Sequence, residues 1–257
     1  MTLKIVVMNP KGGSGKTTIA MNLAAFYAAH DKFPALMDLD AQASSTRWLA
    51  KRTAAVPPIH GVSPFNIPAK VTRTFAMRIP PGVQRIIVDT PAALNKREFA
   101  EVTGDADKIL VPVLPSDIDI QAATRCIADL LLTGKVQRSD NRLAVVANRV
   151  KRNTLVFRSL MRFLEALRIP VVAVLRDSQN YIRAAETGLG LHEMKGARFR
   201  IDQANWESLI EWIERGTVPV ATRLWTDDRP ELEHTSEPTD DMALQRVDIS
   251  RFIDKSS

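Results

Sequence analysis

The sequence predicts an α/β fold built on a doubly wound, mostly parallel sheet. Apolar runs alternate with helix-like stretches along most of the chain, and a glycine-rich loop joins the first run to the first helix. Most runs are continuously apolar, which is typical of strands buried on both faces of a parallel sheet. Ligands of such sheets bind beyond the carboxyl ends of the strands, so we expect the functional residues there.

The predicted elements follow one another in regular alternation. The expected strands cover residues 4–8, 35–39, 85–89, 108–113, 143–147 and 171–175. The expected helices cover residues 17–30, 44–52, 96–103, 120–133, 155–168, 181–188 and 203–215. Residues 54–81 are rich in proline and have no clear period, which predicts short irregular connections.

Composition and length indicate one globular α/β domain. The chain has 257 residues, of which 45% are hydrophobic, enough for a substantial core. No apolar run approaches the roughly 20 residues that span a bilayer, and the first residues lack the pattern of a secretory signal. The single cysteine, Cys126, excludes an internal disulfide and is expected to be a buried thiol. We therefore expect a cytoplasmic protein.

Charge is divided unevenly along the chain. The whole chain carries a net charge of +6, yet residues 217–257 contain five basic and nine acidic residues. We predict a basic globular domain at residues 1–216 and an acidic, disordered C-terminal tail at residues 217–257. The basic domain favours a polyanionic partner.

The glycine-rich loop predicts a phosphate-binding site. Glycines let the backbone turn tightly, so that its N–H groups and the N-terminus of the following helix point at phosphate oxygens. In this pattern Lys16 reaches the β- and γ-phosphates, and the Thr17 hydroxyl binds Mg²⁺. The predicted nucleotide-binding residues of the loop are Lys11, Gly12, Gly13, Ser14, Gly15, Lys16, Thr17 and Thr18.

The head of the loop departs from the common phosphate-loop pattern. That pattern places glycine six residues before the lysine, whereas this chain has Pro10 there, followed by a second lysine, Lys11. The block resembles the deviant Walker A box of the ParA/MinD ATPases, most closely that of small, ParF-like partition proteins, and the resemblance covers about residues 1–216. It implies a P-loop NTPase that binds ATP and Mg²⁺ and forms a sandwich homodimer. Lys11 would cross the interface of that dimer to the partner's phosphates.

Three carboxylates follow predicted strands. Asp38 and Asp40 follow the second strand, in a segment that resembles the switch I region of the family. The resemblance implies that Asp40 orients the attacking water and that Asp38 holds waters around Mg²⁺. Asp89 ends a run that resembles Walker B, where it can hold Mg²⁺ beside Thr17. The predicted catalytic residues are Lys11, Lys16 and Asp40, with water as the nucleophile.

Asn148 follows the fifth predicted strand, at the place where the family contacts adenine. The resemblance therefore implies that Asn148 binds the base, and it favours ATP over GTP. Asparagine after a strand is also a common turn residue, which is the alternative interpretation.

A basic region follows in residues 142–200, which contain twelve basic and four acidic residues. Such groups bind DNA phosphates without regard to sequence, and the binding falls steeply with salt. A merely solvated basic face is the alternative for any one of them. The predicted contacts to double-stranded DNA are Arg149, Lys151, Arg152, Arg158, Arg162, Arg183, Lys195, Arg198 and Arg200.

These features favour an ATPase that partitions or positions an intracellular cargo on nucleoid DNA. A ParB-like or other cargo adaptor would stimulate slow ATP hydrolysis, and the cargo could be a plasmid, a carboxysome or a protein cluster. A MinD-like ATPase on the membrane surface is the alternative. Residues 242–253 offer it only a partial apolar stripe among acidic residues, so membrane binding is disfavoured. Carriers of metal clusters share the loop but need more cysteines than Cys126.

Overall fold

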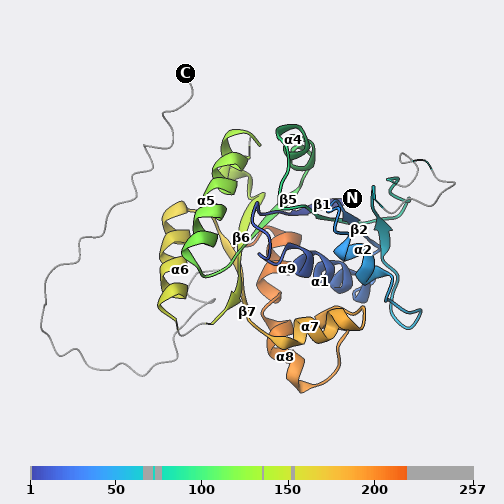
Figure 1. Cartoon of the computed structure of the whole chain (residues 1–257). Helices are drawn as coiled ribbons and strands as arrows, with labels where there is room; N and C mark the ends of the chain where they lie inside the picture. The colour runs from blue at the N-terminus through green and yellow to red at the C-terminus, as the bar shows by residue number, and fades with distance from the viewer. Residues whose placement is uncertain (1, 66–71, 73–76, 135, 152–153, 219–257) are drawn as a thin grey trace, which may run out of the picture. The chain divides into compact units, whose positions relative to one another are not determined.

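The computed structural model of the chain describes residues 2–65, 72, 77–134, 136–151 and 154–218. All of them belong to a compact unit that spans Met1–Trp225. Within it the described strands form one seven-stranded sheet in the order β3-β2-β4-β1-β5-β6-β7 (Figure 1). Every neighbouring pair is parallel, which confirms the predicted doubly wound sheet.

Most predicted elements are present, with small shifts of their ends. The strands are β1 (Leu3–Val7), β2 (Pro34–Asp38), β3 (His60–Val62), β4 (Arg85–Asp89), β5 (Lys108–Val113), β6 (Leu143–Val150) and β7 (Val171–Arg176). The helices are α1 (Lys16–Ala29), α2 (Ser44–Leu49), α4 (Lys96–Gly104), α5 (Asp117–Leu132), α6 (Leu155–Leu167), α7 (Gln179–Glu186), α8 (Ala197–Ala204) and α9 (Glu207–Arg215). Two short 3₁₀ turns are η1 (Arg138–Asp140) and η2 (Leu191–Glu193).

The core has two layers, one on each face of the sheet. Successive side chains of a strand point to opposite faces. In β1, Ile5 and Val7 accordingly pack in a cluster with α1, α8 and α9, whereas Val6 packs in a second cluster with α4, α5 and α6. Figure 1 shows α5 and α6 on one side of the sheet and α1 and α9 on the other. This double burial explains why the strands read as continuous apolar runs.

Two local predictions were wrong. Residues 54–81 were expected to be irregular, but His60–Val62 form the edge strand β3, which pairs with β2. A three-residue strand is too short to show a period. The expected helix at residues 203–215 is divided, because α8 ends at Ala204 and α9 begins at Glu207. Trp206 lies between them, fully buried, and its packing in the core accompanies the break.

The helices differ in how their N-termini are satisfied. Side chains of Asn95, Ser116, Thr154 and Ser178 accept hydrogen bonds from backbone N–H groups at the starts of α4, α5, α6 and α7. At the start of α1, Gly15 adopts a left-handed conformation, and no side chain of the described residues caps the helix. The first N–H groups of α1 are therefore available to a ligand.

Candidate functional site

The loop between β1 and α1 forms an open cradle at the carboxyl edge of the sheet. Gly13 and Gly15 have φ angles of 78° and 96°, left-handed values that glycine adopts readily. Among the described residues, a Cβ atom at Gly12 or Gly13 would meet nothing within 4 Å, so this side of the loop is open. An open loop of backbone beside an uncapped helix N-terminus fits a polyphosphate anion.

Lys16 lies within this loop. The residue is only 7% exposed, and its Nζ donates to the Lys11 carbonyl oxygen at 3.2 Å. Burial lowers the pKa of Lys16, whereas the charges of Asp89 and Asp40 raise it. The ammonium group is thus enclosed by the loop and close to two of the predicted carboxylates.

Asp38 and Asp89 lie side by side at the ends of β2 and β4, where they are register partners. Burial raises the pKa of Asp89 to about 6, although the hydroxyls of Ser45 and Thr17 lower it. Within the described part of the chain, the buried Oδ1 of Asp89 has no hydrogen-bond partner. A buried carboxylate oxygen without a partner, beside a hydroxyl group, fits a hydrated Mg²⁺.

The first turn of α2 supplies two hydroxyls that the sequence analysis did not single out. Ser45 Oγ donates to Asp89 Oδ2 at 2.6 Å. Thr46 donates to Asp38 Oδ2 twice, from its backbone N at 2.8 Å and from Oγ1 at 2.9 Å. The run of hydroxyl residues directly after the acidic segment was a signal that could have revealed them.

Asp40 lies between the sheet and α2. Its Oδ1 accepts a hydrogen bond from the Gln42 backbone N at 2.9 Å, and its own backbone N donates to Asp38 Oδ1 at 3.2 Å. Ala43 then takes a left-handed conformation, with φ of 51°, just before α2 begins. The half-buried Asp40 carboxylate is therefore held by its own loop, and its charge raises the pKa of Lys16.

Lys11 does not point into the loop. Its Nζ lies 2.5 Å from Asp119 Oδ2 in the first turn of α5, and Ser116 Oγ donates to the same carboxylate oxygen. The Lys11 side chain is 32% exposed, whereas that of Asp119 is 3% exposed. Asp119, which comes after the fourth predicted strand, was not among the predicted site residues.

Asn148 contacts the phosphate loop directly. Its side chain is buried, and Nδ2 donates to the Ser14 carbonyl oxygen at 2.9 Å. The structure thus brings the predicted adenine residue against the backbone of the predicted phosphate site. Of the predicted site residues, all from Lys11 to Thr18 belong to this loop or to the first turn of α1.

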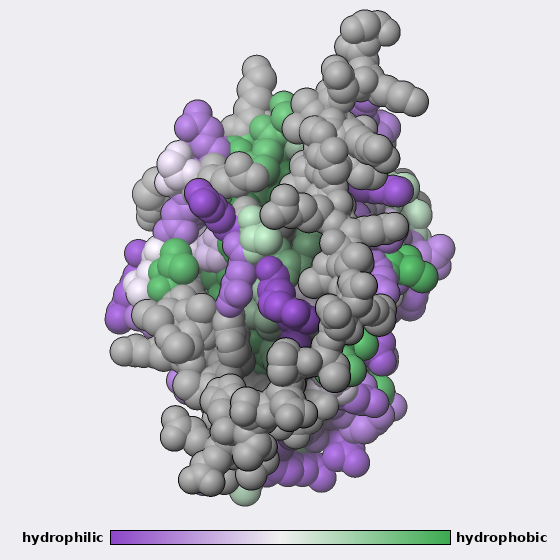
Figure 2. All heavy atoms as spheres, turned by 90° about the vertical axis from the view of Figure 1, so that its left-hand side faces the viewer, coloured by the Kyte–Doolittle hydropathy of each residue, from purple (hydrophilic) through white to green (hydrophobic). Residues whose placement is uncertain are grey.

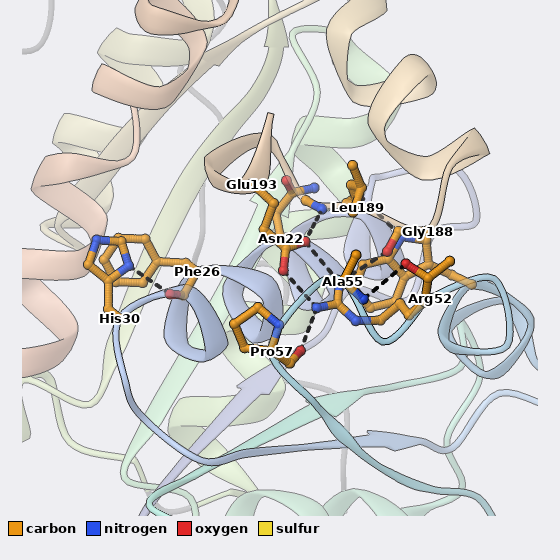
Figure 3. Close-up of polar contacts among 12 residues, drawn as sticks. Asn22, Phe26, His30, Arg52, Ala55, Pro57, Gly188, Leu189 and Glu193 are labelled. Atoms are coloured by element: carbon orange, nitrogen blue, oxygen red, sulfur yellow. Dashed lines mark hydrogen bonds and ion pairs between the residues drawn. The ribbon is translucent and has the colours of Figure 1, made fainter. Parts of the chain in front are cut away.

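The chain after α2 is bound to the segment that follows α7 (Figure 3). Arg52 forms hydrogen bonds with both carboxylate oxygens of Glu193, at 2.8 and 2.6 Å, and donates to the carbonyl oxygens of Gly188 and Pro57. The two charged side chains are 6% and 3% exposed. Asn22 of α1 accepts from Leu191 N, so the same segment also contacts the phosphate-loop helix.

The basic residues predicted to bind DNA do not share one face. Arg158 and Arg162 are exposed on α6, whereas Arg183, Arg198 and Arg200 are exposed on α7 and α8, which pack on the opposite side of the sheet. Arg149 pairs with Asp177 at 3.2 Å, Lys151 and Lys195 are exposed, and Arg152 lies outside the described residues. On the face of α5 and α6, Figure 2 shows hydrophilic side chains with scattered hydrophobic ones between them.

Three further expectations concern cysteine chemistry and membranes. Cys126 is 2% exposed, and burial raises its pKa to about 12, so the thiol is buried as predicted. Across the described ranges, no group of three histidine, cysteine or acidic side chains is arranged to hold a metal ion. No helix in that part of the chain is both long and apolar enough to cross a bilayer. The stripe at residues 242–253 lies outside the described residues, as does the predicted tail beyond residue 218.

Known proteins resemble the chain in sequence and in fold. The maintenance of carboxysome distribution protein A of Gloeobacter kilaueensis is 29% identical over 220 residues, covering 82% of this chain and 94% of that protein. The septum site-determining protein MinD of Thermotoga maritima is 27% identical over 249 residues, covering 84% and 89%. The MinD of Pyrococcus horikoshii, solved as a complex with Mg-ADP, has the same fold, with a TM-score of 0.55 at 15% identity over 84% of this chain and 100% of that one.

A family model gives the assignment. The CobQ/CobB/MinD/ParA nucleotide binding domain matches residues 5–191, which is more than half of the chain. The geometry of the phosphate loop and of the carboxylates around it agrees with that match. The chain therefore belongs to the CobQ/CobB/MinD/ParA nucleotide binding domain family.

Proposed function

We propose that this protein is a partition or positioning ATPase that binds DNA without sequence preference in its ATP-bound dimeric form. The open phosphate loop, which encloses Lys16 close to Asp89, carries the proposal. The similarity to a carboxysome distribution protein supports a role in spacing a cargo. In this proposal the protein works in the cytoplasm, on the nucleoid.

The chemistry assigned to the site is hydrolysis of ATP by water. Thr17, Asp38 and Asp89 would hold Mg²⁺, which supplies charge neutralisation at the β- and γ-phosphates. Lys16 adds a positive charge beside the same phosphates. Asp40 would orient the attacking water, and no protein nucleophile is needed.

A test of that assignment is Asp40→Asn. The change keeps the size of the side chain but removes its charge, so we expect ATP hydrolysis to fall about 100-fold or more while ATP binding persists. Steady-state phosphate release and equilibrium binding of ATP are measured on the same preparation. Hydrolysis at the wild-type rate would remove Asp40 from the mechanism.

Dimerisation is proposed through Lys11 and the nucleotide. In this proposal Lys11 leaves Asp119 and contacts the phosphates bound by the partner subunit. Lys11→Ala would then abolish the ATP-dependent dimer, which light scattering after size-exclusion chromatography detects. A dimer of normal strength together with normal hydrolysis would contradict the proposal.

DNA binding by the dimer is tested with random-sequence duplex DNA. Binding is measured with ATP, with ADP and without nucleotide, each at two salt concentrations. Tight binding that needs ATP and falls steeply with salt supports the proposal. Equal binding in all three nucleotide states contradicts it.

Substitutions then locate the DNA contacts. Arg158→Ala combined with Arg162→Ala removes two charges from α6 and is compared with Arg183→Ala on α7. Arg97→Ala is the matched control, because Arg97 is an exposed arginine of α4 outside the predicted set. A variant that has lost a phosphate contact should bind DNA more weakly. The slope of the logarithm of its affinity against the logarithm of the salt concentration should be smaller by about one.

A MinD-like function on the membrane surface is the second candidate, favoured by the similarity to MinD of Thermotoga maritima. It predicts ATP-dependent sedimentation of the full chain with anionic phospholipid vesicles. The same protein would then show no ATP-dependent binding to duplex DNA. ATP-dependent binding to vesicles without binding to DNA would favour the membrane function, and the opposite result would favour the DNA-based one.

A further inference from the structure

The carboxamide of Asn148 is held in one orientation. Nδ2 donates to the Ser14 carbonyl oxygen at 2.9 Å, and Oδ1 accepts from the Arg149 backbone N at 3.0 Å. Exchanging the two ends of the amide would place a donor against a donor and an acceptor against an acceptor. The residue is 6% exposed, so water does not readily replace either bond. Asn148 is therefore a defined link between β6 and the phosphate loop.

The backbone of β6 is shaped to make this link. Ala147 pairs with Val174, and Val150 pairs with Arg176, so β6 carries one residue more than β7 between these pairs. Arg149 lies within this bulge and has a φ angle of 52°, a conformation that is uncommon for arginine. Bulges of this kind redirect a side chain, and here the bulge directs Asn148 towards β1 and its loop.

Gly15 leaves the space that Asn148 occupies. A Cβ atom at Gly15 would lie 2.1 Å from Asn148 Nδ2. Any side chain at position 15 would therefore displace the carboxamide. Gly15 has a second role, because it also allows the left-handed turn with φ of 96° that starts α1.

We infer that Asn148 is a positioning residue for the phosphate loop, whose hydrogen bond to Ser14 keeps the loop in the shape that binds phosphate. The inference deepens the proposed nucleotide-binding function and rests on it. Without the bond, the loop would populate other shapes, and the apparent affinity for any polyphosphate would fall with the competent fraction. The effect would be the same for ligands with and without a base.

The test compares three ligands on the full-length chain. Binding of inorganic tripolyphosphate, ATP and GTP, each with Mg²⁺, is measured by calorimetry for the wild type and for Asn148→Ala. We expect all three dissociation constants to rise by a similar factor of about ten, as for loss of a buried hydrogen bond. If Asn148 only contacted adenine, Asn148→Ala would raise the dissociation constant of ATP and leave that of tripolyphosphate unchanged. That result would overturn the inference.

Asn141→Gly is the matched control. Asn141 Nδ2 also donates to a backbone carbonyl oxygen, that of Gly216, but it lies at the opposite end of β6. Its φ angle is 52°, which glycine tolerates. This variant loses that bond and the one that Asn141 Oδ1 accepts from Trp212 Nε1, both away from the loop, so its ligand affinities should stay at the wild-type values. If Asn148→Ala and Asn141→Gly lost ligand affinity equally, general destabilisation of the fold would explain the loss, and the inference would be overturned.

Two further measurements keep the outcome decisive. Asn148→Ser keeps a polar side chain that is too short for the Ser14 carbonyl, and it replaces the alanine variant if that variant does not fold. Asn148→Ala should add little when it is introduced into Gly15→Ala, because the alanine Cβ already displaces the carboxamide from Ser14. If the wild type binds none of the three ligands, the proposed function and the inference both fail. If it binds them and Asn148→Ala binds as well, only the inference fails.

Discussion

The Nζ atom of Lys11 lies 2.5 Å from Oδ2 of Asp119, which joins the head of the phosphate loop to the first turn of α5. The lysine that the proposed dimer would use is therefore engaged within its own subunit. Because Asp119 is buried and Lys11 is part-exposed, release of the lysine leaves a buried carboxylate without its counter-charge. In the proposed cycle, this contact would oppose dimerisation of the free protein.

Asp119→Asn is expected to ease dimerisation. The asparagine keeps the shape of the side chain but carries no negative charge. Moving Lys11 away from position 119 therefore costs less free energy. We expect the ATP-dependent dimer to form at a several-fold lower protein concentration, as measured by sedimentation with a non-hydrolysable ATP analogue. Asp117→Asn, an exposed aspartate in the same turn, is the control. An unchanged dimerisation constant in Asp119→Asn would show that the pair does not hold Lys11 back.

The contrast between Lys11 and Asp119 also shows what the sequence could predict. The phosphate loop is local, because glycines and lysine at fixed spacing determine its backbone, and its strand and helix were both recognised. Asp119 is 108 residues away from Lys11, and only the pairing of β5 with β1 brings the two together. Ser45 likewise reaches Asp89 through the placing of α2, which the hydrophobic pattern does not determine.

Ser45→Ala is expected to weaken Mg²⁺ binding. Ser45 Oγ donates to Asp89 Oδ2, which fixes the direction of Oδ1, the oxygen that has no partner in the described part of the chain. Loss of such a supporting bond lowers metal affinity by roughly tenfold or more in other sites. The Mg²⁺ concentration that half-saturates binding of a fluorescent ADP analogue reports the change, and the affinity measured without Mg²⁺ should stay the same.

Ser44→Ala is the control for that measurement. Ser44 precedes Ser45 in α2, but its hydroxyl accepts only from the exposed Arg47 among the hydrogen bonds found in the described residues. It removes a hydroxyl from the same turn without touching Asp89. If Ser45→Ala and Ser44→Ala need the same Mg²⁺ concentration as the wild type, Ser45 has no role at the metal site.

Glu193→Ala is expected to destabilise the fold strongly. It removes the partner of the buried Arg52 and leaves an uncompensated guanidinium group, a change that typically lowers the free energy of unfolding by about 3–5 kcal/mol. Urea denaturation followed by circular dichroism measures it. Glu101→Ala breaks the exposed pair with Arg97 and should change the same quantity far less, because solvent screens that pair. If both variants lowered the free energy of unfolding by similar amounts, burial of the Arg52–Glu193 pair would not explain its contribution to stability.

His192 makes the stability of the protein depend on pH, and the direction of that dependence follows from its pKa. Burial lowers its pKa from 6.5 to about 4, helped by the neighbouring His30, and its ring packs edge-on against Phe26 and Trp206. As pH falls, the unfolded chain takes up the proton first, near pH 6.5. The contribution to stability is therefore complete above that pH and is lost as pH falls towards about 4.

His192→Phe removes this titration and keeps an aromatic ring in the cluster. From the size of the shift, we expect the wild type to lose about 2 kcal/mol more of its unfolding free energy than the variant between about pH 7 and pH 5. Urea denaturation of both proteins across that range provides the difference, in which the titrations of the acidic groups cancel. Because the charged imidazolium is disfavoured by its apolar surroundings, the wild-type curve must be the steeper one. Parallel curves would mean that His192 is solvated when it is protonated, with the aromatic cluster open to water.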